Sequence, residues 1–382
     1  MSFLRKPSWQ FSPWMMIETE PCRHLYIHVP FCAHICGYCD FVHVICRRES
    51  VEQWLSAVIK EMEYAHIPDT IETIYIGGGT PTSPDPDQLD ALLSAIDPYA
   101  RHVKEYTIEI NPETLDETKA KILHRHGINR ASIGFQSSDP SLLALMGRKH
   151  TMDTMHTCVS LLREEGITNL SVDLMYSLPG QTMAQLRQSV YDALSLHPSH
   201  LSLYSLTIEE NTVFGKMGYD HLDEDSEADM YEWIVKTLDE EGYTQYEVSN
   251  FAHQGCTSMH NIGYWQYDDF IGIGTGASGK ENGSRYDHSR SLSAYIKDPC
   301  HREMIPLSKE DQMFESLMMG IRMKQGMDLS VFEKRFGESF EHHYGDVLST
   351  MIQQGHMEIV DGRLRASEKS YEIMNSLLVE FM

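Results

Sequence analysis

Three of the eight cysteines in this 382-residue chain fall close together, in the stretch CAHICGYC (32–39). Cys32, Cys36 and Cys39 have the spacing C-x3-C-x2-C and follow an apolar run, LYIHVPF. Thiolates bind soft metals, whereas a disulfide scaffold needs a denser distribution of cysteines. The cluster therefore indicates metal or redox chemistry, in a chain whose thiols stay reduced, as they do in the cytosol.

The spacing leaves three interpretations of this cluster open. A zinc site would combine the thiolates with His28, His34 or His43, although structural zinc usually has two cysteine pairs. Buried thiols without a metal are a second interpretation, because free cysteine packs as a small apolar residue. An iron–sulfur cluster is the third. A four-iron cluster usually has four thiolate ligands, so three would leave one iron open to an exchangeable ligand.

Further candidate residues lie in or just after apolar segments. A Gly-Gly-Gly turn at 77–79 ends one of them, and glycine lets a backbone approach a ligand closely. Asp173 lies inside another apolar segment, where a buried carboxylate needs partners. Contact with a ligand and a structural hydrogen bond to a loop are equally expected roles for Asp173. Glu109 lies near the end of the expected strand 106–110. Gln136 follows the expected strand 128–135, and Arg148 comes shortly after it.

Apolar runs alternate with amphipathic segments from residue 24 onward. The expected strands are 24–29, 73–78, 106–110, 128–135, 170–176 and 200–206, and the expected helices are 51–65, 88–96, 117–127, 154–166 and 185–196. This alternation predicts an α/β fold with a parallel sheet and right-handed crossovers. Functional residues gather at the C-terminal edge of such a sheet, and the cysteines and glycines fall there.

The pattern changes after residue 210. We expect an N-terminal extension over 1–22, the α/β domain over 23–210, a loop-rich region over 211–300 and a small helical domain over 301–382. In the last of these, helical segments precede a β-hairpin that turns on Asp361-Gly362. This order of elements is typical of a winged helix.

Acidic residues outnumber basic ones, 56 against 31, for a formal net charge of −25. Nucleic acids and anionic membrane surfaces attract basic proteins, so neither is expected as the main partner. No run of 18 apolar residues occurs, so we expect no membrane-spanning helix. The first sixteen residues lack the long apolar stretch of a signal peptide. A cytoplasmic protein is the expectation.

The C-x3-C-x2-C motif resembles that of the radical S-adenosylmethionine (SAM) superfamily. With GGGTPT, IGFQS, LMYSLPGQT, YEVSNFA, HNIGYW and GIGTGA, it makes the chain from residue 24 onward similar to the HemN/HemW group. The resemblance implies a partial (β/α)6 barrel followed by a small, winged-helix-like domain. Oxidases of the group carry a further cysteine two residues after the third. Phe41 stands there in this chain, as in the heme chaperones of the group.

By this resemblance, Cys32, Cys36 and Cys39 hold a [4Fe–4S] cluster whose open iron binds SAM. Positions that contact SAM in the oxidase relatives correspond to Tyr26, Tyr38, Gly78, Gly79, Thr80, Glu109, Gln136, Arg148 and Asp173. In HNIGYW, His260 is the candidate axial ligand of a heme iron, with Tyr264 beside it, because imidazole suits iron and aromatic rings pack on a porphyrin. A buried structural histidine is the alternative role for His260.

The resemblance favours a heme chaperone that binds heme, the cluster and SAM, and passes heme to a respiratory acceptor protein. An oxygen-independent coproporphyrinogen III oxidase is the alternative, and Phe41 argues against it. The net charge disfavours a third hypothesis, a radical SAM enzyme that acts on RNA. Peripheral contact with a membrane and a homodimer are both open expectations.

Overall fold

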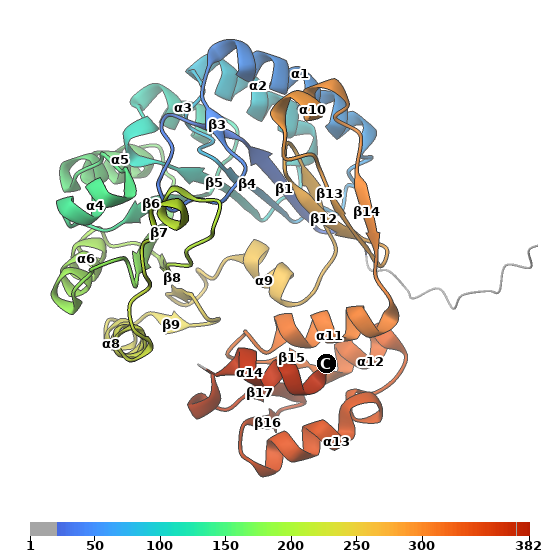
Figure 1. The fold of residues 1–382 in the computed structure, drawn as a ribbon. Coiled ribbons are helices and arrows are strands. Elements are labelled where there is room, and N and C mark those ends of the chain that lie inside the picture. Colours follow the sequence, from blue (N-terminus) through green and yellow to red (C-terminus); the bar gives the residue numbers. More distant parts are fainter. Residues whose placement is uncertain (1–20, 372) are drawn as a thin grey trace, which may run out of the picture.

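The computed structural model describes residues 21–371 and 373–382, so the expected N-terminal extension lies almost wholly outside the described residues. Six adjacent parallel strands form the centre of a twelve-stranded sheet. They are β1 (His24–Val29), β4 (Thr73–Gly78), β5 (Glu105–Ile110), β6 (Arg130–Gln136), β7 (Asn169–Tyr176) and β8 (His200–Ser205). All six strand predictions are confirmed. Figure 1 shows the sheet curving into an open, partial barrel, as the fold prediction required.

Helices between the strands cover the outer face of the sheet (Figure 1). They are α1 (Arg48–Tyr64), α2 (Pro86–Ile96), α3 (Glu117–Arg125), α4 (Pro140–Met146), α5 (Met152–Glu164) and α6 (Met183–Ser195). Each buries an apolar stripe; in α1, for example, Val51, Trp54 and Val58 are buried. Five of these helices were expected. The seven-residue α4 was not, because it is too short to show a helical period.

Residues 211–300 contain more helices and strands than the sequence led us to expect. They contain α7 (Val213–Met217), α8 (Glu224–Glu240), α9 (Met259–Trp265), α10 (Leu292–Lys297), β9 (Thr244–Gln245), β10 (Asn250–Ala252), β11 (Phe270–Ile273), β12 (Ser278–Glu281) and β13 (Ser284–Asp287). The strands are too short to show a period of two. The 17-residue α8 did carry a signal, because its buried Met230, Ile234 and Leu238 are spaced four apart.

Short strands extend the sheet on both sides of the parallel centre. β11 is parallel to β1, and β12, β13 and β14 (Glu303–Pro306) continue outward as an antiparallel ladder. At the opposite edge, β10 and β9 follow β8. A separate short pair, β2 (Phe31–Cys32) with β3 (Val44–Ile45), holds the two ends of the loop that carries the cysteines.

The C-terminal part has its own hydrophobic core. It comprises α11 (Lys309–Gly320), β15 (Met327–Asp328), α12 (Leu329–Phe336), α13 (Phe340–Gln353), β16 (Met357–Val360), β17 (Arg363–Ala366) and α14 (Met374–Leu378), with the sheet order β15-β17-β16. Asp361 and Gly362 connect β16 to β17 with φ values of 50° and 75°, the left-handed pair of a tight hairpin. The winged-helix-like prediction is confirmed. No helix in the described part of the chain is long and apolar enough to cross a membrane.

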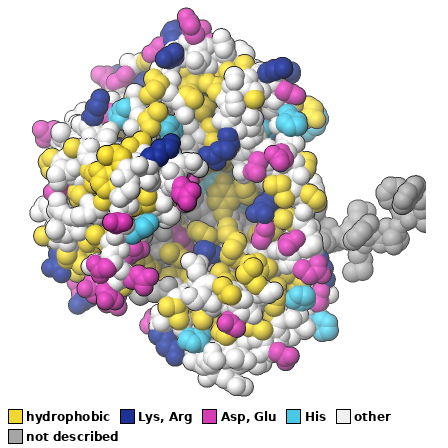
Figure 2. All heavy atoms as spheres, in the orientation of Figure 1, with side chains coloured by type: hydrophobic (Ala, Val, Ile, Leu, Met, Phe, Trp, Pro, Cys, Tyr) yellow, Lys and Arg dark blue, Asp and Glu magenta, His cyan; other side chains and the backbone are white. Residues whose placement is uncertain are grey.

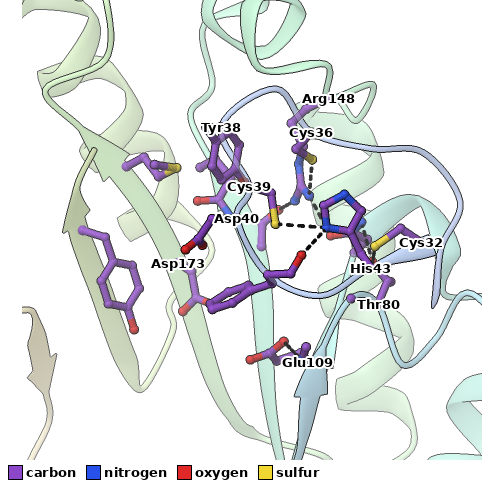
Figure 3. Close-up of a pocket in the computed structure, with 18 of the residues that line it drawn as sticks. Cys32, Cys36, Tyr38, Cys39, Asp40, His43, Thr80, Glu109, Arg148 and Asp173 are labelled. Carbon is purple, nitrogen blue, oxygen red and sulfur yellow. Dashed lines mark hydrogen bonds between the residues drawn. The ribbon is translucent and has the colours of Figure 1, made fainter. Parts of the chain in front are cut away.

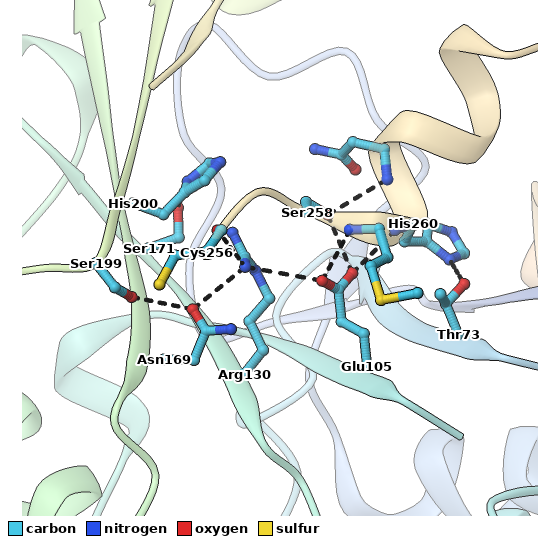
Figure 4. Close-up of polar contacts among 12 residues, drawn as sticks. Thr73, Glu105, Arg130, Asn169, Ser171, Ser199, His200, Cys256, Ser258 and His260 are labelled. Carbon is cyan, nitrogen blue, oxygen red and sulfur yellow. Dashed lines mark hydrogen bonds and ion pairs between the residues drawn. The ribbon is translucent and has the colours of Figure 1, made fainter. Parts of the chain in front are cut away.

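Helix α9, which carries the HNIGYW motif, lies across the N-terminal ends of the parallel strands. Glu105, the first residue of β5, holds it there (Figure 4). Its carboxylate accepts hydrogen bonds from Ser258 Oγ at 3.1 Å and from the backbone N–H groups of Met259 and His260, both at 2.9 Å. The guanidinium of Arg130 lies 3.7 Å away. A buried carboxylate thus satisfies the unpaired N–H groups at the start of the helix.

Replacing Glu105 with alanine should lower the free energy of unfolding by about 3–5 kcal/mol, since it leaves a buried arginine and three donors without their acceptor. Urea denaturation of the purified protein measures this change. Glu72→Ala is the control, because the pair between Glu72 and Lys104 is exposed and contributes less than about 1 kcal/mol. Equal losses in the two variants would contradict the anchoring role of Glu105.

Candidate functional site

The cysteine loop borders a pocket of about 450 Å³ inside the C-terminal end of the barrel (Figure 3). All three cysteines line this pocket. Eight of the nine predicted SAM contacts line it as well: Tyr38, Gly78, Gly79, Thr80, Glu109, Gln136, Arg148 and Asp173. These residues come from different strand ends and loops across more than a third of the chain. The parallel sheet therefore gathers them as the sequence predicted.

Each thiol has a polar neighbour. The hydroxyl of Thr80 points at Cys32 Sγ, a guanidinium nitrogen of Arg148 at Cys36 Sγ, and Nδ1 of His43 at Cys39 Sγ, each at 3.8 Å. Burial raises the pKa of Cys32 to about 12 and that of Cys39 to about 11. These two thiols therefore keep their protons until a metal displaces them, and the neighbouring donors stabilise the resulting thiolates.

The side chains fit an iron–sulfur cluster better than a single zinc ion. Within residues 21–371 and 373–382, no three His, Cys, Asp or Glu side chains gather closely enough to hold one metal ion. The ring of His28 is engaged elsewhere, by the Tyr26 hydroxyl at 2.9 Å and the Val42 carbonyl oxygen at 2.8 Å. A four-iron cluster binds each thiolate on a separate iron, so its ligands need not converge on one point.

Three glycines in the wall of the pocket have no room for a side chain. A Cβ atom at Gly78, where φ is 107°, would lie 2.6 Å from the ring of His28. A Cβ at Gly79 would lie 2.9 Å from the backbone of Phe31, and one at Gly134 would lie 2.7 Å from Arg148. A larger residue at any of these positions would push the wall out of place. The space beside the thiols therefore depends on glycine.

Two carboxylates line the pocket opposite the cysteines. Glu109 accepts hydrogen bonds from the Tyr75 hydroxyl at 2.9 Å and from the backbone N–H of Gly78 at 3.0 Å. Burial, helped by the charge of Asp173, raises the pKa of Glu109 to about 7. Burial also raises the pKa of Asp173, which accepts hydrogen bonds from Ser132 at 2.8 Å and from Ser171 at 3.2 Å. Asp173 thus has structural partners and still faces the pocket.

The backbone is irregular where β6 reaches the pocket. Gln136 has a φ of 64°, and the pairing of β6 with β7 shifts register between Gly134 and Gln136. A non-glycine residue in the left-handed region is uncommon and occurs often at functional sites. The guanidinium of Arg148 donates hydrogen bonds beside this bend, to Asn111 Oδ1 at 2.8 Å and to the carbonyl oxygen of Gly134.

Sequence reasoning missed several pocket residues. Tyr75, Asn111, Ser132, Met175 and Tyr204 line the pocket but were not predicted. Tyr75 carried a usable signal: Thr73, Tyr75 and Gly77 alternate along β4 and so share one face of the strand. Asn111 carried none, because its role depends on Arg148, which is distant in sequence.

Tyr26 and the two motif residues His260 and Tyr264 do not line the pocket. Tyr26 lies on the neighbouring strand β1, with its ring 6.2 Å from that of Tyr75. His260 is fully buried at the opposite end of the barrel, about one strand length, ~20 Å, from the cysteine loop. Its Nδ1 is hydrogen-bonded to Thr73 Oγ1 at 2.7 Å, and its Nε2 to the Tyr264 hydroxyl at 2.8 Å. Both ring nitrogens of His260 are therefore engaged.

Comparison with known proteins gives the family. Residues 26–192 match the model of the radical SAM superfamily, and residues 307–371 match that of the HemN C-terminal domain. The chain is 38% identical to heme chaperone HemW of Lactococcus lactis, over 94% of this chain and 96% of the relative. It is 36% identical to heme chaperone HemW of Escherichia coli, over 96% and 100% respectively. The chain belongs to the HemW family.

The solved structure of coproporphyrinogen III oxidase (HemN) from Escherichia coli has the same fold, with a TM-score of 0.82 over 96% of this chain and 92% of that one. Its identity to this HemW-family chain is 19%, so it supports the fold only. Membership in the radical SAM superfamily implies a [4Fe–4S] cluster and SAM as cofactors. The three thiols, the glycine wall and the buried carboxylates fit that pair.

Replacing Cys36 with alanine should abolish assembly of the cluster, because two thiolates remain where three are available. Iron and acid-labile sulfide per chain, after anaerobic reconstitution, measure this loss. Cys46→Ala is the matched control: the backbone N–H of Cys46 donates to the Cys32 carbonyl oxygen at 2.8 Å, but its side chain does not line the pocket. Full iron content in Cys36→Ala would overturn the assignment.

Proposed function

We propose that this protein is a cytoplasmic heme chaperone: it binds heme, holds a [4Fe–4S] cluster with SAM, and passes heme to a respiratory acceptor protein. One observation carries the proposal: the chain matches relatives called heme chaperones over almost their whole length, and Phe41 occupies the position of the additional cysteine in the oxidases. The formal net charge of −25 agrees with a partner that is not a nucleic acid.

The pocket would hold the cluster through Cys32, Cys36 and Cys39. When bound, the cluster would supply an open iron that the amino and carboxylate groups of SAM can chelate. The role of the protein would be to position SAM. Glu109 offers a carboxylate to the positive charge of SAM, and Gly78 and Gly79 let the backbone approach SAM closely. These roles follow from the family resemblance and from the shared pocket.

The mouth of the pocket is apolar. Ile35, Phe41 and Tyr204 line the pocket and are 46%, 61% and 42% exposed. Figure 2 shows the molecular surface hollowed between the sheet and the C-terminal domain, with hydrophobic side chains in the hollow. An exposed apolar rim of this kind suits a flat, largely apolar molecule such as a porphyrin. This rim, with Phe41, is the alternative heme site to His260, which lies at the opposite end of the barrel.

We assign the axial ligand of heme to His260, with one condition that the structure imposes. Its Nε2 contacts iron only after the Tyr264 hydroxyl has moved away. Heme binding would therefore involve a displacement within α9, at the end of the barrel that faces the C-terminal domain (Figure 1). The apparent affinity then reflects how readily the Tyr264 hydroxyl leaves.

Heme titration followed by absorbance tests this assignment. His260→Ala should lower the affinity at least tenfold, because it removes the iron ligand. Tyr264→Phe should raise it severalfold, since it frees Nε2 without removing the ring. If Phe41→Ser weakens binding and His260→Ala does not, heme binds at the mouth of the pocket instead. If reconstituted wild type binds no heme, the chaperone proposal fails.

The oxidase alternative is tested in the same preparation. Anaerobic incubation with coproporphyrinogen III, SAM and reductant should yield no protoporphyrinogen, as analysed by chromatography. Phe41→Cys restores the additional thiol and serves as the comparison. Turnover by the wild type would replace the chaperone with the oxidase as the function of this chain.

The affinity for SAM should rise with pH, because Glu109 has a pKa near 7 and attracts a cation only when ionised. The titratable groups that interact with it are Tyr26, Tyr75, Tyr264, Asp173 and Cys39. From pH 6 to pH 8 the ionised fraction grows from about one tenth to about nine tenths, so the affinity should increase by about tenfold. Equilibrium dialysis with reconstituted protein measures it. Glu109→Gln should bind weakly at both values, and an equal pH response in that variant would contradict the role of Glu109.

A further inference from the structure

The two ends of the barrel are connected through one side chain, Tyr75. It is the third residue of β4, where it lines the pocket and also contacts His260 of α9. Its hydroxyl donates to Glu109 Oε1 at 2.9 Å, and its ring stacks on that of His260, with centroids 5.2 Å apart and planes inclined by 29°. The same tyrosine thus contacts a pocket carboxylate and the histidine of the HNIGYW motif.

Little room exists for Tyr75 to adopt another position while these contacts hold. A Cβ atom at Gly77 would lie 2.9 Å from the Tyr75 ring and 2.8 Å from Glu109 Oε1. The ring of Tyr26 lies on a neighbouring strand, 6.2 Å from Tyr75. The pair of Tyr75 and Glu109 is therefore packed tightly on the side of Gly77. In a packed interior, a shift of one ring is transmitted to its neighbours.

His260 is itself held from several sides. Its backbone N–H donates to Glu105, and its Nδ1 is bonded to Thr73 Oγ1, which is 2.8 Å from Nδ1 of His24. The other ring nitrogen of His24 faces Asp268 at 3.4 Å, and Asp268 pairs with Arg335 of the C-terminal domain at 3.3 Å. The ring that supports Tyr75 is thus anchored to the sheet and, through His24 and Asp268, to the C-terminal domain.

We propose that His260 is a positioning residue for the SAM pocket: its ring holds Tyr75, and Tyr75 holds the carboxylate of Glu109 toward the ligand. The inference rests on the proposed SAM site around Glu109. It extends the role of His260 beyond heme. A ligand that moves the His260 ring away from Tyr75 removes the support of Tyr75. Heme bound at one end of the barrel therefore lowers the affinity for SAM at the other. By thermodynamic linkage, bound SAM lowers the affinity for heme by the same factor.

The test is SAM affinity in heme-free, cluster-reconstituted protein, by anaerobic equilibrium dialysis. Tyr75→Phe keeps the ring stack and removes the hydrogen bond to Glu109, so the affinity should fall by roughly three- to tenfold. His260→Ala removes the stack and should cause a similar fall. The double variant should lose little more than either single one, because both act on Glu109 through the same contact.

His260→Phe is the matched control, since it retains a ring against Tyr75 but has no nitrogen for iron. It should keep SAM affinity within about twofold of wild type and still lose heme binding. The inference is overturned if Tyr75→Phe leaves SAM affinity unchanged, or if His260→Phe lowers it as much as His260→Ala does. If the alanine variant does not fold, these two variants decide the question.

The outcomes also separate this inference from the proposal on which it rests. Loss of SAM binding in Glu109→Gln, together with normal binding in Tyr75→Phe, removes the inference and leaves the SAM site intact. Normal SAM binding in Glu109→Gln removes the proposed site itself. If the two sites are coupled, adding heme to the wild type should lower the SAM affinity by the factor seen in His260→Ala. Adding heme should not change the SAM affinity of His260→Phe.

Discussion

The parallel pairing of β1, β4, β5, β6, β7 and β8 is the constraint on which the rest of the structure depends. Because every strand runs in the same direction, all the C-terminal ends meet at one end of the barrel and all the N-terminal ends at the other. The cysteine loop, the glycine turn and Arg148 thereby share a pocket, although they are far apart in sequence. Thr73, Glu105 and Arg130 share the opposite end for the same reason.

Buried polar groups make the two ends of this barrel different. At the pocket end, donors face three sulfur atoms, and two carboxylates line the wall. At the other end, Glu105 is saturated by the start of α9 and Arg130, and His260 uses both its ring nitrogens. Satisfied groups rigidify a structure, whereas pocket groups are placed for a ligand. The pocket is thus arranged to bind a ligand, and α9 is a support that, in the proposed function, must open before His260 can bind iron.

In the proposed function, the SAM pocket and the heme site meet at Tyr75. A chaperone has to hold its cargo and then release it, and a release signal needs a physical contact between the two sites. The ring stack with His260 and the hydrogen bond to Glu109 supply such a contact within a packed interior. Through His24 and Asp268 the same network reaches the C-terminal domain, the part of the chain most distant from the cysteines.

The sequence by itself determined the strands, the winged-helix-like end and the pocket contributors that follow strand ends, because periodicity and short-range spacing are local properties. C-x3-C-x2-C, the glycine turn and Asp173 were recognisable on these terms, whereas Glu109 was assigned by the family resemblance. Only the tertiary structure decided that Asn111 belongs to the site, that short strands extend the sheet within 211–300, and that His260 lies at the far end with both nitrogens engaged. Those facts depend on contacts between residues distant in the chain, such as His260 with Thr73 and Glu105, which no local pattern encodes.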